Sequence, residues 1–111
     1  MTVRVTRGIE MSADEIVTQA AQLITGGDYA GAMGVFESYI DSNPDDPAGY
    51  HGWAEAALFD IQENGNLDDK GNDRINEGQI NAYFRRAASM APDNADYNAA
   101  YANALVEFDR I

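Results

Sequence analysis

The chain has 111 residues, enough for one domain with a modest core, and it contains no cysteine, which excludes disulfides, thiolate metal sites and thiol nucleophiles. Its 19 acidic residues against 7 lysines and arginines give a formal net charge of −12. This charge disfavours binding to nucleic acid and to membrane surfaces, and it would attract a basic protein segment. The alternative is that the charge is a general property of the proteins of a salt-adapted cell, in which case it says nothing about a partner. No apolar run approaches the roughly 18 to 20 residues of a membrane span or resembles a secretory signal, so we expect a soluble, cytoplasmic protein.

The opening segment and the first predicted helix differ in pattern. Residues 1–11, MTVRVTRGIEM, alternate weakly and are expected to be a flexible or strand-like leader. Ser12 and Glu15 then form a Ser-x-x-Glu capping box, in which each side chain can satisfy a backbone amide of the first helical turn. Apolar residues recur at helical spacing until TGG, so the first helix is predicted at about 13–25.

A proline-rich turn separates the second predicted helix from the third. Asp28 can cap the second helix, whose single apolar stripe runs over residues 32–40. Pro44 disfavours helical geometry at the residue before it, so this helix ends there. Pro47 follows two acids and fits the first position of a third helix, which the apolar spacing extends through residue 62.

Two more helices follow a polar segment. The stretch INAYFRRAASM predicts a fourth helix, which closes at Pro92. A last helix is predicted over about 95–110, with an apolar side formed by Tyr97, Tyr101, Ala102, Leu105 and Phe108. Because helices this short are marginal alone in water, their apolar stripes must pack on one another, and the predicted fold class is all-α.

Two parts of the chain repeat the same spacing. Phe36 precedes Pro44 by eight positions, and Phe84 precedes Pro92 by eight positions as well. Each proline is followed by a polar cap and a new helix, which indicates a helix-turn-helix unit used more than once. With these residues the chain resembles the tetratricopeptide repeat family, whose unit of 34 residues has small residues where its two helices touch and a proline at its end.

The resemblance covers residues 12–111. In the first unit the matching residues are Ala20, Gly27, Tyr29, Ala32, Phe36 and Pro44. In the second unit they are Tyr50, Ala54, Phe84, Ala87 and Pro92, and a third unit begins at Ala95 with Ala102 at the small position. The resemblance implies a right-handed α-solenoid fragment of two units and a C-terminal capping helix, in which Ala20 and Ala32 allow close helix approach.

The second unit departs from the family pattern by an insertion at about 63–77. Pro44 and Pro92 are 48 positions apart rather than 34. Read as a calcium loop from Asp68 or from Asn66, the insertion places lysine at a ligand position, so neither register gives an EF-hand. We expect a solvated acidic loop that caps the fourth helix, and the open alternative is weak divalent binding by Asp68, Asp69 and Asp73.

No group of residues supports catalysis, a cofactor or a metal centre. His51 is the one histidine and has no neighbouring nucleophile, so we expect it on a helix surface or in a groove rather than as a catalytic base. The glycines at 26–34 lack the Gly-Lys-Ser/Thr of a phosphate loop. Arg85 and Arg86 are expected on a solvated helix face. We therefore expect a protein that is not an enzyme.

The resemblance implies a partner-binding groove lined by the first helix of each unit. The predicted groove residues are Val17, His51, Glu55, Phe59, Asn103 and Glu107. Glu55 and Glu107 are expected to contact charges on a basic or amphipathic partner, and Phe59 is the expected apolar anchor. Family members that grip a C-terminal carboxylate use Lys, Arg and Asn in this groove, and only Asn103 is of that kind, so this mode is not expected.

The predicted function is therefore a scaffold or adaptor that binds a partner peptide or protein face. Two alternatives stay open. The exposed ends of so short an array could pair into a homo-oligomer. A divalent-metal-responsive module acting through the 63–77 insertion is the weaker alternative.

Overall fold

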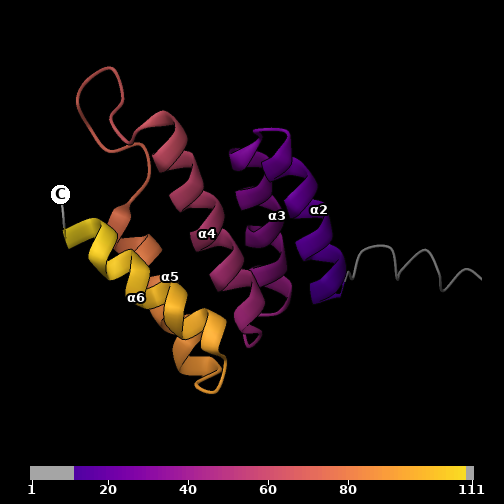
Figure 1. Ribbon diagram of the computed structural model, residues 1–111. Helices are drawn as coiled ribbons and strands as arrows, with labels where there is room; N and C mark the ends of the chain where they lie inside the picture. The colour runs from indigo at the N-terminus through magenta and orange to yellow at the C-terminus, as the bar shows by residue number, and fades with distance from the viewer. Residues whose placement is uncertain (1–11, 110–111) are drawn as a thin grey trace, which may run out of the picture.

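A computed structural model describes residues 12–109, which form five α-helices in chain order (Figure 1). The helices are α2 (Ala13–Thr25), α3 (Tyr29–Ser42), α4 (Pro47–Asn64), α5 (Glu77–Met90) and α6 (Ala95–Asp109). Within residues 12–109 there is no strand, and Leu67 and Asp73 form one isolated antiparallel bridge. The all-α fold class is confirmed. The leader predicted at residues 1–11 lies outside the described residues, as do the side chains of residues 107–109.

The starts of the helices are fixed by the predicted capping residues. The Ser12 hydroxyl accepts a hydrogen bond from the Glu15 amide at 3.2 Å, and the Glu15 carboxylate accepts one from the Ser12 amide at 2.9 Å. Asp28 accepts a bond from a first-turn amide of α3 at 2.8 Å, and Asp46 does the same for α4 at 2.9 Å. Each cap satisfies an amide that has no partner within its own helix.

The helices contact their neighbours in the chain. α3 packs between α2 and α4, α5 packs on α4 and α6, and α2 also touches α4. The rings of His51 in α4 and Tyr97 in α6 lie 4.6 Å apart, which brings these two helices together as well. α4 therefore contacts all four of the other helices.

The core combines small residues with a few aromatic rings. Ala20 and Ala32, predicted to allow close approach of α2 and α3, are both buried. The largest fully buried side chains are Phe84 and Ile80. Trp53 is also buried, and its Nε1 donates a hydrogen bond to Glu37 at 3.0 Å. Trp53 is thus a core residue.

Gly52 of α4 packs against the ring of Phe36 of α3. A Cβ atom added at this glycine would lie 2.2 Å from the ring of Phe36, far inside van der Waals contact. Both Gly52 and Phe36 are buried. Glycine is therefore needed here for packing, because this stretch of α4 is an ordinary helix that any residue could adopt.

The buried side of α6 differs from the prediction. Ala102 is exposed and Leu105 is 42% exposed, whereas Ala104 is completely buried. α6 packs on its neighbours through the side that carries Ala104 and the half-buried Tyr101. No helix within residues 12–109 covers the opposite side, where Val106 is 56% exposed. The assignment of Ala102 to a buried small position was wrong.

The insertion is slightly shorter than predicted. α4 continues to Asn64 and α5 begins at Glu77, so residues 65–76 connect them. The side chain of Asn76 accepts a hydrogen bond from the Gln79 amide at 3.0 Å and caps α5, as expected of this loop. Among the helices described, none combines the length and the hydropathy needed to cross a membrane.

Candidate functional site

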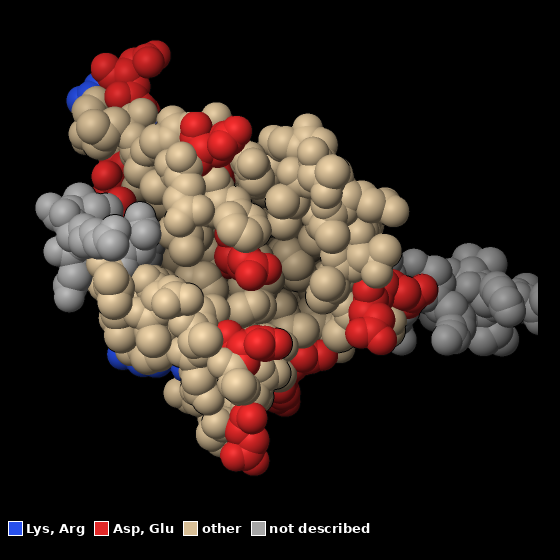
Figure 2. Space-filling view, in the orientation of Figure 1, with Lys and Arg blue, Asp and Glu red and all other residues tan. Residues whose placement is uncertain are grey.

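The helices α2, α4 and α6 carry acidic residues and no basic ones, a property that α3 shares. These helices contain two, three and three acidic residues respectively, and none of them contains lysine or arginine. Figure 2 shows acidic side chains across the molecule, some of them in a central hollow, while basic side chains appear only at the margin. This surface therefore repels anions and attracts cations.

Three of the predicted groove residues form one line along α4. His51, Glu55 and Phe59 follow one another at intervals of four residues, which places them on the same side of the helix. The Glu55 side chain is 47% exposed, and Phe59 is 38% exposed. The Nε2 atom of His51 lies 3.7 Å from a carboxylate oxygen of Glu55. This line offers a charge and an apolar ring to a partner.

The other predicted residues lie on the flanking helices. Val17 of α2 is 48% exposed, and Asn103 of α6 is exposed. Glu107 also belongs to α6, but its side chain lies outside the described part of the structure. Of the five predicted groove residues whose side chains are described, the structure brings His51 and Glu55 within 3.7 Å of each other. Phe59 lies one turn further along α4, and Val17 and Asn103 lie on α2 and α6.

His51 joins α4 to α5 and α6. Its ring stacks on Tyr97 at 4.6 Å and meets the edge of Phe84 at 5.8 Å. Its Nδ1 atom is buried and has no hydrogen-bond partner. Burial lowers the pKa of His51, and the nearby carboxylates of Glu55 and Asp96 oppose that effect only in part. The imidazole is therefore neutral at neutral pH and acts as an aromatic packing residue.

The lowered pKa of His51 predicts how stability depends on pH. Below the ordinary pKa of 6.5 the unfolded chain binds more protons than the folded one. The contribution of neutral His51 to the free energy of unfolding is thus fully present above about pH 6.5 and is lost as the pH falls through the folded-state pKa. Urea unfolding between about pH 7 and pH 5 should show this decline, and His51→Gln should flatten it. An equal decline in both proteins would contradict the assignment.

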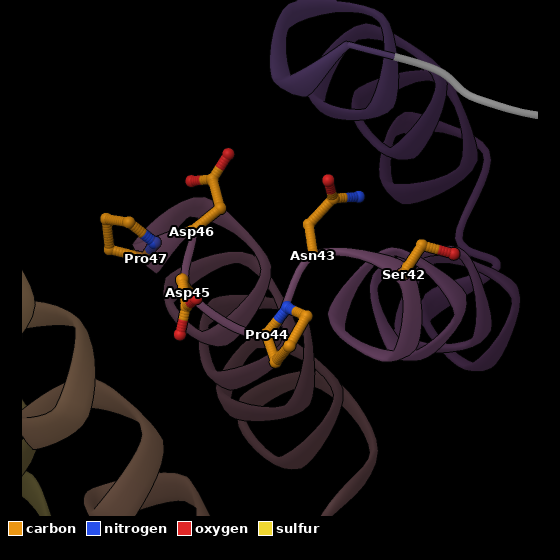
Figure 3. Close-up of a pocket in the computed structure, with 6 residues that line it drawn as sticks. All are labelled: Ser42, Asn43, Pro44, Asp45, Asp46 and Pro47. Atoms are coloured by element: carbon orange, nitrogen blue, oxygen red, sulfur yellow. The ribbon is translucent and has the colours of Figure 1, made fainter.

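The turn between α3 and α4 forms a shallow surface depression, but its side chains do not converge on a ligand position. Its lining consists of the consecutive residues 42–47 (Figure 3). Asp45 and Asp46 point to different sides of the turn. Asp46 already caps α4 and accepts a hydrogen bond from the Tyr39 hydroxyl at 2.5 Å. Burial and this carboxylate raise the pKa of Tyr39 to about 12, so the tyrosine stays protonated. These contacts stabilise the turn.

An ion pair between the buried Asp60 and the exposed Arg74 connects the 65–76 segment to α4. Asp60 is only 7% exposed, and its carboxylate accepts hydrogen bonds from Arg74 at 2.8 Å and from Asn64 at 2.9 Å. Arg74 also donates to the backbone carbonyl of Gly65. Burial by itself raises the pKa of Asp60, but the hydrogen bonds from Arg74 and Asn64 and the Arg74 charge outweigh it and hold the pKa below its usual value.

The acidic tip of this segment is held by its own backbone. The Asp68 carboxylate accepts hydrogen bonds from the amides of Lys70 and Asn72 at 2.8 and 2.9 Å. In the same segment, the Asn66 side chain accepts a hydrogen bond from the Ile75 amide and donates one to the Ile75 carbonyl. Within residues 12–109 no three His, Asp or Glu side chains are grouped so that they could hold a metal ion. Asp68 therefore has a structural role in the turn.

Comparison with known proteins identifies no relative of this chain. No protein-family model, curated protein or solved structure matches it. The acidic surface of α2, α4 and α6, with its exposed apolar side chains, is therefore the basis for assigning a function.

Proposed function

We propose that this protein is an interaction module that binds a basic or amphipathic segment of a partner protein. The binding surface, called the acidic face below, is the side of α2, α4 and α6 that carries Val17, His51, Glu55, Phe59 and Asn103. In this proposal α2–α3 and α4–α5 are two tetratricopeptide-like helix pairs, and α6 is the capping helix. The contacts of each helix with the next one, and of α2 with α4, support this arrangement.

The observation that carries the proposal is the charge of the three helices. An exposed phenylalanine and an exposed glutamate stand one helical turn apart on α4, and α2, α4 and α6 contain no lysine or arginine. A partner with basic residues would be steered to this surface by its field and oriented by Glu55. An apolar side chain of the partner would then cover the ring of Phe59. Buried contacts of this kind supply most of the affinity of such interfaces.

Fluorescence anisotropy with synthetic peptides tests the proposal. Three labelled peptides of equal length and apolar content would be used, one basic, one acidic and one uncharged. We expect the basic peptide to bind most tightly, and its affinity to fall steeply with salt. Glu55→Lys should weaken it about tenfold or more, because a repulsive contact replaces an attractive one. Phe59→Ala should weaken both the basic and the uncharged peptide.

The matched control is Asp41→Lys. Asp41 is an exposed acid on α3, away from the acidic face, so its reversal changes the net charge equally but should alter the affinity less than about threefold. Equal losses for Glu55→Lys and Asp41→Lys would show a nonspecific charge effect and contradict the proposal. The second candidate function is self-association through the exposed side of α6 that includes Leu105 and Val106. Sedimentation velocity of the same samples distinguishes it from peptide binding, because it measures whether the protein forms oligomers.

A further inference from the structure

The chain itself contains a segment with the chemistry that the acidic face selects. Residues 1–11 carry Arg4 and Arg7 against a single acid, Glu10. Arg4 stands between two valines, and Arg7 follows a threonine, in the order Val-Arg-Val-Thr-Arg. The four other basic residues outside the last two positions belong to the 65–76 segment and to α5. Residues 1–11 thus carry a net positive charge and directly precede α2, one of the three helices of the acidic face.

This segment is long enough to reach the middle of the face. Arg4 stands eight residues before Ser12, and a chain of that length spans up to about 28 Å when extended. α2 and α4 begin at the same end of the molecule (Figure 1). Neighbouring helix axes lie about 10 Å apart, and Glu55 stands eight residues, or about 12 Å, beyond the first residue of α4. Arg4 and Arg7 can thus both come within hydrogen-bond range of Glu55.

Tethering favours this contact over one with a separate molecule. A short connection gives the attached segment an effective concentration on the order of millimolar at the face. The interaction is between opposite charges, so its strength decreases as salt shortens the screening length from about 8 Å at physiological ionic strength. A weak intrinsic affinity is therefore sufficient for the face to be occupied much of the time.

We propose that residues 1–11 bind to the acidic face of their own chain, with Arg4 and Arg7 beside Glu55, and compete there with the external partner. This inference depends on the proposed function of the face and adds its regulation. An external basic segment would have to displace the chain's own segment before it bound. The affinity for partners is then lower than the face alone would give, and it rises when the internal segment is released.

Paramagnetic relaxation in the 111-residue protein tests the contact. Because the chain has no cysteine, Thr2→Cys provides a unique site for a nitroxide spin label. We expect the label to attenuate amide signals of Phe59 and Asn103 but not that of Asp41 on α3. The attenuation should disappear when Arg4 and Arg7 are both replaced by glutamate, and it should decrease in high salt. Attenuation confined to α2 would overturn the inference.

Two further measurements separate the remaining outcomes. In a mixture of spin-labelled protein and isotope-labelled protein without the spin label, attenuation as strong as within one molecule would overturn the inference in favour of docking onto a second copy. The Arg4→Glu/Arg7→Glu variant should bind the external basic peptide several-fold more tightly. If the peptide binds both proteins equally and no attenuation is seen, the internal contact fails while the proposed function stands. If attenuation is seen but no external peptide binds, the internal contact stands and the proposed function fails.

Discussion

Replacing Arg74 with alanine is expected to lower the free energy of unfolding by about 2 kcal/mol, less than the roughly 3–5 kcal/mol for a fully buried ion pair, because Arg74 is itself exposed. The substitution leaves the carboxylate of Asp60 buried on α4 with Asn64 as its remaining side-chain donor. It also removes both hydrogen bonds that Arg74 makes to Gly65, so the 65–76 segment loses its attachment. Urea unfolding at neutral pH measures the change in free energy.

The pH dependence provides a second test of the same pair. Because the folded-state pKa of Asp60 lies below its ordinary value of 3.8, the contribution of the pair is fully present above that pH and is lost as the pH falls through the folded-state pKa. The Arg74→Ala protein should lack this acid-dependent loss. Lys70→Ala is the matched control, since Lys70 is exposed in the same segment and its removal should change stability by less than about 0.5 kcal/mol. Equal effects of the two substitutions would show that Asp60 does not need Arg74.

Replacing Gly52 with alanine is expected to lower the free energy of unfolding by roughly 1–2 kcal/mol, since an overpacking cost of about 2–3 kcal/mol is offset in part by the helix propensity of alanine. The added methyl group would overlap the buried ring of Phe36, so α3 and α4 would have to separate or the ring would have to move. This cost exceeds the advantage of about 1 kcal/mol that alanine has over glycine within a helix. Thermal or urea unfolding of the variant measures the balance between these two effects.

Gly34→Ala is the matched control for this substitution. Gly34 lies within α3, is exposed, and has no atom within 4 Å of the position where a Cβ would stand. Only the helix-propensity effect acts there, so the same substitution should raise stability by about 0.5–1 kcal/mol. Phe36→Leu in the Gly52→Ala protein should recover part of the lost stability, because it removes the overlapping ring atoms. Destabilisation of similar size at both glycines would contradict the close approach.

The helices could be predicted well from sequence because their boundaries depend on local signals. Ser12, Asp28 and Asp46 each cap the helix that follows, and Pro47 occupies the first position of α4. These residues act through backbone amides two or three positions away, so their effect does not depend on the rest of the fold. The start of α5 was harder to place, because its cap, Asn76, lies in a polar segment with several other possible caps.

The pairings between helices could not be predicted in the same way. Asp60 and Arg74 stand on either side of a connecting segment, and only the folded loop brings their side chains together. An acid within the apolar pattern of α4 was a signal that a partner was needed, but not which one. Similarly, the stacking of His51 on Tyr97 depends on how α6 is rotated about its axis. That rotation also decided which alanine of α6 is buried, and the family resemblance placed it wrongly.

Each helix contacts chiefly the helices next to it in the chain, and this affects how fast the protein folds. Contacts between residues close in sequence form with little loss of chain entropy, so a topology of this kind folds in microseconds to milliseconds. Opening need not be all-or-none either. α6, which has one uncovered side, can separate before the inner helices do, and its amides should exchange with solvent most readily. A segment bound across α4 and α6 would hold that last helix closed and suppress its opening.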